Sequence, residues 1–130
     1  MAAMTNLDEM LRTLTVSVRE GRYTFATVER APALGDGVDA VIHEAERDTV
    51  VATLERAEAE GWPIDFVATW LTLDVHSALE AVGLTAAFSA ALGAASIPCN
   101  VLAGFHHDHL LVPAERADEA VAVLERLRDR

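Results

Sequence analysis

The stretch from Leu71 to Val112, LTLDVHSALEAVGLTAAFSAALGAASIPCNVLAGFHHDHLLV, decides the fold. Alternating apolar and polar or aromatic residues predict a strand from Phe66 to Val75. The alanine-rich segment Leu84–Leu92 predicts a helix whose small side chains allow close approach to a sheet. Two short apolar segments, 99–104 and 109–112, predict the arms of a hairpin. The stretch therefore predicts the order strand, loop, helix, strand, turn, strand.

The start of the central helix has two interpretations. Ser77 and Glu80 have the spacing of a capping box, which would begin the helix at Ala78. Gly83 would then lie inside the helix, at a cost of up to about 1 kcal/mol relative to alanine. Alternatively, residues His76–Ala81 form a loop and the helix begins near Gly83. The spacing alone leaves both interpretations open.

The flanking segments continue this mixture of strands and helices. Apolar residues at helical spacing predict a leading helix over Thr5–Leu14, and a strand opened by Gly21 is expected over Tyr23–Val28. The remaining expected elements are two strands, a short helix and a closing helix, over residues 39–45, 49–54, 54–60 and 115–128. This order predicts an α+β fold with antiparallel sheets, in the pattern of two ferredoxin-like split-βαβ units.

Composition places the chain among globular proteins and excludes several functions. It has 130 residues, of which 52% are hydrophobic, and no uninterrupted apolar run of about 18 residues. A net charge of −11 argues against nucleic acid or membrane as the main partner. All ten basic residues are arginine, so a Schiff-base or phosphate-binding lysine is excluded. The single cysteine and the absence of a basic, apolar leader favour a cytoplasmic location.

His106, His107, Asp108 and His109 are the candidate metal ligands, because imidazole and carboxylate groups suit transition metals. On a hairpin, alternation would place His107 and His109 on one face and His106 and Asp108 on the other. Each face then offers two ligands, whereas a site needs three or four. A hydrogen-bonded turn beside a binding cleft is therefore favoured, and no metal or cofactor is predicted.

No catalytic arrangement is predicted. Asp74, His76 and Ser77 are too close along one extended segment to form a triad, because adjacent strand residues point to opposite faces. Cys99, at the entrance to a strand, fits a small buried residue better than a nucleophile. We therefore expect no enzyme activity.

The segment from Leu73 to Pro113 resembles the small bacterial stand-alone ACT-domain proteins and the tandem regulatory ACT domains of aspartokinases. The motifs that carry the resemblance are VHS-LEAVGLTAA, I-CNV-AG and HDHL-VP, and the likeness is weaker over the amino-terminal half. The resemblance implies a ferredoxin-like ACT fold with two intertwined βαββαβ units. These units are expected at residues 1–65, with the leading helix, and 66–130, with strands shared between them.

ACT modules commonly bind an amino acid or similar effector at the loop between their first strand and first helix. The resemblance therefore implies a non-catalytic regulatory module, and it favours the loop over the capping-box helix. Carried over to this sequence, the ligand-binding residues are His76, Ser77, Leu79, Val82 and Gly83 in the loop, with Ile97, Pro98, Cys99 and Asn100 in the facing turn.

The residue types fit this role. A glycine at a helix start exposes backbone N–H groups to a carboxylate, and an asparagine offers both a donor and an acceptor. One departure from the ACT pattern is that Gly83 follows Ala81 and Val82, without the proline that many ACT loops carry. The identity of the effector is therefore left open.

Two other functions are consistent with the sequence. One is an assembly module whose ACT sheets pair with a protein partner, or with another copy of the chain, without an effector. Uncovered sheet edges favour such self-association. The other is a metal-binding protein that uses the histidine cluster. Ligand-dependent stability and metal content distinguish the three.

Overall fold

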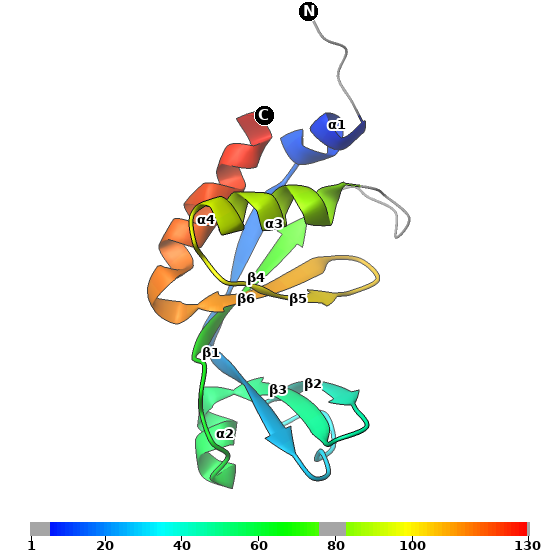
Figure 1. Cartoon of the computed structure of the whole chain (residues 1–130), viewed down its shortest axis with the longest axis vertical. Coiled ribbons are helices and arrows are strands. Elements are labelled where there is room, and N and C mark those ends of the chain that lie inside the picture. The colour runs from blue at the N-terminus through cyan, green and yellow to red at the C-terminus, as the bar shows by residue number, and fades with distance from the viewer. Residues whose placement is uncertain (1–5, 76–82, 130) are drawn as a thin grey trace, which may run out of the picture. The chain divides into compact units, whose positions relative to one another are not determined.

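The computed structural model describes residues 6–75 and 83–129 (Figure 1). Its strands follow the hydrogen-bonded order β2-β3-β1-β4-β6-β5. In chain order, the elements are α1 (Asn6–Arg12), β1 (Thr15–Val28), β2 (Val38–His43), β3 (Asp48–Thr53), α2 (Leu54–Glu60), β4 (Ala68–Asp74), α3 (Leu84–Ala94), β5 (Asn100–Ala103), β6 (Asp108–Pro113), the 3-10 turn η1 (Ala114–Arg116), α4 (Ala117–Glu125) and the 3-10 turn η2 (Arg126–Asp129).

The chain forms two compact units that are not continuous in sequence. The first contains Met1–Arg19 and Trp70–Arg130, and the second contains Glu20–Thr69. Strand β1 contributes its first residues to the first unit and continues in the second. Strand β1 is thus shared between the two units. The expected division of the chain into residues 1–65 and 66–130 stays a prediction.

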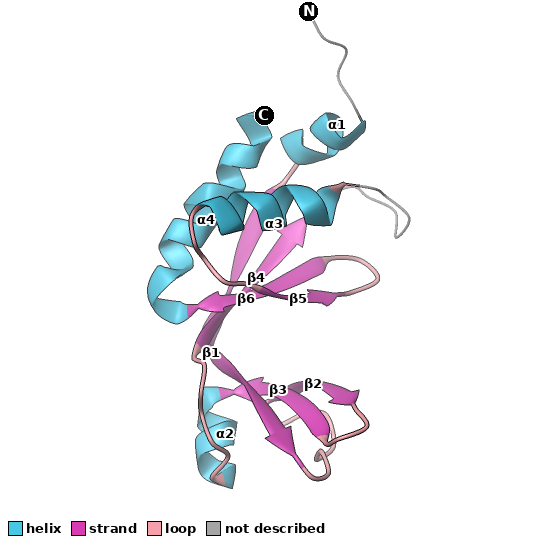
Figure 2. Ribbon diagram, in the orientation of Figure 1, coloured by secondary structure: helices cyan, strands magenta, loops and turns pink. Residues whose placement is uncertain are grey.

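The first unit packs its helices on one face of its sheet, as Figure 2 shows for α1, α3 and α4. Leu71 and Leu73 of β4 are buried in this helix-side core, as their alternation predicts. Trp70, Thr72 and Asp74 therefore lie on the opposite face of β4. The helices supply much of the rest of this core, including Leu11, Leu84, Phe88, Leu92, Ala120 and Leu124, and Leu14, Ile97, Leu110 and Val112 complete it from outside the helices.

The second unit is built on the hairpin β2–β3, with β1 paired antiparallel to β3. No helix lies between β1 and β2, and the connecting segment 29–37 is held by hydrogen bonds instead. The Ala31 N–H donates to Asp48 Oδ2 at 2.8 Å, and Arg56 Nη1 donates to the Asp36 carbonyl at 2.8 Å. Hydrogen bonds from His43 and from Ala31 lower the pKa of Asp48, so its carboxylate is an anchor for this segment.

Capping residues define both ends of helix α2. Thr53 is the N-cap, and its Oγ1 accepts a hydrogen bond from the Arg56 N–H at 3.2 Å. Gly61 ends the helix with φ of 72°, a left-handed conformation that favours glycine, as predicted.

Replacing Thr53 by alanine is expected to lower the free energy of unfolding by about 1 kcal/mol, because one N–H of α2 loses its acceptor. Urea denaturation measures the loss. The matched control is Thr85→Ala, in the exposed first turn of α3, which should change stability by less than about 0.5 kcal/mol. Equal losses in the two variants would contradict the capping role.

Three expectations need correction. The strand expected at Tyr23–Val28 begins at Thr15, and Gly21 lies inside it with φ of 95° instead of opening it. The leading helix ends at Arg12 instead of Leu14. The closing helix is divided into η1, α4 and η2. The other elements agree within a few residues.

Candidate functional site

Gly83 is the one residue of the predicted effector loop within the described part of the chain. It is the N-cap of α3 with φ of 99°, so it does not lie inside a helix as the capping-box alternative required. A Cβ at this position would lie 3.2 Å from Leu7 Cδ2 of α1. The other four predicted loop residues lie outside the described residues: His76, Ser77, Leu79 and Val82.

The four predicted residues of the facing turn connect α3 to β5. Ile97 is 3% exposed in the helix-side core, and Cys99 is half-buried against that core. Pro98 and Asn100 are exposed. The eleven residues of α3 span about 16 Å, so they separate Gly83 from this turn. Within one copy of the chain, Gly83 therefore does not lie beside the facing turn.

The turn of the β5–β6 hairpin lies at the carboxyl end of β4. Asp74 ends β4, and its Oδ1 is 3.7 Å from His107 Nδ1 in the hairpin turn. The hairpin turn and the start of α3 lie at the same end of the first unit (Figure 1). Asn100 begins β5 at the far end of the hairpin, opposite Leu111. The histidines thus flank the end where the effector loop is expected.

An apolar groove of about 510 Å³ begins at Gly83 and follows α3. Alanines of α3 form its floor, with one leucine from α1 and one from η2 at its sides: Leu7, Ala86, Ala87, Ala90, Ala91 and Leu127. Concave apolar walls with few polar groups are typical of small-molecule sites. The sequence analysis did not identify the two leucines as site residues. The alanines of α3 did indicate a helix face with only small side chains, on which a groove can form.

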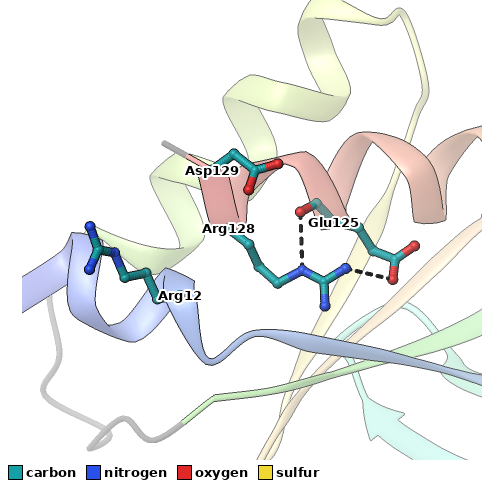
Figure 3. A pocket seen from close by; sticks show the side chains of 4 residues that line it. All are labelled: Arg12, Glu125, Arg128 and Asp129. Atoms are coloured by element: carbon teal, nitrogen blue, oxygen red, sulfur yellow. Dashed lines mark hydrogen bonds and ion pairs between the residues drawn. The ribbon is translucent and has the colours of Figure 1, made fainter.

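A second depression, of about 670 Å³, is open and charged (Figure 3). Arg128 donates to Glu125 through Nη2 at 3.0 Å, while Arg12 points away from the other three side chains that line it, Asp129 included. Exposed charges of this kind are screened by salt and water. The depression is therefore a weaker candidate for selective binding than the groove.

A polar cluster lies on the other face of the first unit's sheet. Trp70 Nε1 donates to His109 Nδ1 at 3.1 Å, and Thr72 Oγ1 lies 3.1 Å from the same nitrogen. An indole N–H only donates, so Nδ1 is an acceptor and the imidazole is neutral. Burial, followed by the charges of Arg19 and His107, lowers the pKa of His109. The sequence placed His107 and His109 on one face, but gave no sign of Trp70 as their neighbour.

This arrangement gives the metal-binding alternative no support. His109 already uses Nδ1 as a hydrogen-bond acceptor. In the part of the chain that the structure describes, no three histidine, cysteine, aspartate or glutamate side chains are placed to hold a metal ion.

Cys99 does not have the character of an activated nucleophile. Burial raises the pKa of its thiol, which disfavours the thiolate that nucleophilic chemistry requires. The described residues therefore supply no cysteine nucleophile.

The sequence matches the ACT domain twice, over residues 66–126 and over residues 2–69. The chain belongs to the ACT-domain family. A solved protein of unknown function from Vibrio cholerae, VC0802, described as a possible transport protein, is 36% identical to it. That match covers 94% of this chain and 95% of the other, with a TM-score of 0.83. No curated protein gave a significant match.

Aspartokinases share the fold. The regulatory subunit of aspartate kinase from Thermus thermophilus, in its ligand-free form, has a TM-score of 0.59 at 13% identity, covering 86% of this chain and 95% of that one. A structure of aspartokinase α and β subunits has a TM-score of 0.61 at 11% identity, covering 88% and 97%. The ferredoxin-like ACT fold is confirmed.

The first unit contains the elements of one ACT fold, drawn from two separate parts of the chain. Elements β4, α3, β5, β6 and α4 supply βαββα, and the first part of β1 lies beside β4 as the remaining edge strand. ACT domains are regulatory rather than catalytic and generally bind small-molecule effectors, so the chain is of the regulatory ligand-binding class. No helix among residues 6–75 and 83–129 has the length and apolar character to cross a membrane.

Proposed function

We propose that this chain is a non-catalytic regulatory module that binds an amino acid at the amino-terminal end of α3. The observation that carries the proposal is Gly83, a left-handed N-cap without a side chain, placed where an apolar groove begins. Its action in the cytoplasm is part of the same proposal.

The chemistry of this end of α3 selects the ligand class. The first N–H groups of a helix lack intrahelical acceptors, and they attract a carboxylate. The groove beside them is walled by alanine and leucine side chains, which favour an apolar ligand side chain. An amino acid with an apolar side chain satisfies both requirements.

The predicted turn residues join this site only through a second copy of the chain. Because α3 separates Gly83 from Asn100, both reach one ligand only if the two residues belong to different copies. Strand β5 is last in the hydrogen-bonded order, with Asn100, Val101 and Ala103 exposed. Pairing along this edge is the mode of self-association that we propose.

A thermal-shift screen of the full chain against the common amino acids tests the proposal. A ligand at about 100 times its dissociation constant adds about 2.7 kcal/mol of stability. For a chain of this length, the midpoint should rise by roughly 5–15 °C. We expect this rise for at least one apolar amino acid. If no amino acid raises the midpoint, the assembly module without an effector replaces the proposal.

The variant Gly83→Ala should remove the response to the effector. It places a side chain at positive φ, at a cost of about 1–2 kcal/mol, and directs its Cβ toward Leu7 at the groove. The matched control is Gly93→Ala in the last turn of the same helix, where a Cβ meets nothing within 4 Å. Gly93→Ala should keep the full response, and an equal loss in both variants would contradict the placement of the site.

A further inference from the structure

His109 of β6 makes a side-chain contact with the neighbouring strand β4 that requires a neutral ring. Both Trp70 Nε1 and Thr72 Oγ1 lie 3.1 Å from His109 Nδ1, and the indole can only donate. The Trp70 and His109 rings also pack edge to face, with centroids 5.5 Å apart. We call these interactions of His109 with Trp70 and Thr72 the His109 contact.

A proton on Nδ1 would break the Trp70 part of this contact. The imidazolium would present an N–H to the indole N–H, so two donors would face each other and the hydrogen bond would be lost. We propose that the His109 contact is a proton-sensitive regulatory contact: the neutral ring fixes the turn end of the β5–β6 hairpin to side chains of β4, and protonation at Nδ1 loosens that end while the backbone pairing of β6 with β4 remains.

The charged groups around the ring oppose protonation. The Arg19 guanidinium from β1 lies 3.8 Å from the centroid of the Trp70 ring, next to His109. The His107 ring centroid is 6.4 Å from that of His109, and Asp108 is the neighbouring charge that favours protonation. Burial and the first two groups outweigh Asp108, in agreement with the lowered pKa of His109.

The hairpin turn would respond to loss of the contact. A Cβ on Gly104 would lie 2.8 Å from the His107 carbonyl and 3.2 Å from His109 Nε2, so the turn is packed closely against the His109 ring. His107 Nδ1 is buried and has no hydrogen-bond partner among the described residues, at 3.7 Å from Asp74 Oδ1.

The pH range follows from the sign of the shift. The folded state binds the His109 proton more weakly than the unfolded chain, so the contact contributes fully above the ordinary histidine value of 6.5. Its contribution falls as the pH drops from 6.5 toward the lowered pKa. Between these two values, opening of the turn end of the hairpin should increase by up to about tenfold for each unit of pH.

NMR of the uniformly labelled full chain tests the proposal without any effector. The indole N–H resonance of Trp70, assigned with a Trp62→Phe variant, should titrate with a midpoint below pH 6.5, together with faster exchange of the amides in residues 103–109. His109→Gln keeps an acceptor for Trp70 but no longer titrates, so it should hold the turn end of the hairpin in place over this range. His106→Gln, at the exposed turn, is the matched control and should titrate as the unmodified chain does.

Two results would overturn the proposal. One is a Trp70 indole resonance that does not change between pH 7 and the acid limit of folding. The other is an unchanged titration in His109→Gln, which would assign the response to a group other than His109. The titration of the unmodified chain decides the matter even if the glutamine variant does not fold.

Discussion

Replacing Phe88 by alanine is expected to lower the free energy of unfolding by about 3–5 kcal/mol, the largest loss from a single core residue of α3. Phe88 is 0% exposed and is among the largest fully buried side chains of the described residues. It lies in the middle of α3, in the core that this helix forms with β4, β6 and α4. The alanine-rich helix has few other large side chains, so its neighbours cannot fill the cavity.

Urea denaturation of the full chain measures this loss. Phe105→Ala is the matched control, because it removes the same atoms from a side chain that is 75% exposed in the hairpin turn. The control should change stability by less than about 0.5 kcal/mol. A loss below about 1 kcal/mol for Phe88→Ala would show that α3 is not packed on the sheet as described.

Replacing Gly37 by alanine is expected to lower the free energy of unfolding by about 2–4 kcal/mol, from backbone strain and a steric clash together. Its φ is 91°, and a Cβ there would lie 2.7 Å from Thr53 Oγ1 and 2.9 Å from Arg56 Cβ. Thr53 caps α2, so the clash also displaces the cap of that helix.

Gly35→Ala separates the two causes. Gly35 has φ of 106° in the same connection, but a Cβ there meets nothing within 4 Å. Its replacement should therefore show the strain alone, about 1–2 kcal/mol. Thermal or urea unfolding of both variants gives the difference, and equal losses would mean that the segment before β2 relaxes away from α2.

Local sequence patterns predicted the structure correctly where burial follows the same pattern. Leu71 and Leu73 alternate along β4 and are both buried on the helix side. Gly61 was expected to end α2 and does so in a left-handed conformation. The histidine pair was placed on one face by the same alternation, and both rings lie toward β4, near Trp70 and Asp74.

The first part of β1 could not be predicted because its side chains are mostly exposed. Of residues 15–19, only Val16 is partly buried, so alternation gives a weak signal there. Gly21 then resembles the start of a strand, although it lies within one. What defines this segment is its place beside β4, a pairing between distant parts of the chain.

The candidate site was only partly predictable from the sequence, because it too combines residues from distant parts of the chain. Gly83 was identified from its place before the helix, and the family resemblance gave it a role. Leu7 and Leu127 come from opposite ends of the sequence, and only the fold brings them to the groove beside α3. The hydrogen bond between Trp70 and His109 likewise joins residues 39 positions apart.

The most direct test of the effector site is an NMR titration of the uniformly labelled full chain with a mixture of apolar amino acids. We predict saturable shifts of the amide resonances of Gly83, Ala86 and Leu127, which surround the start of α3 and its groove. No saturable shift, or shifts confined to the charged depression at Arg12 and Asp129, would contradict the proposed effector site.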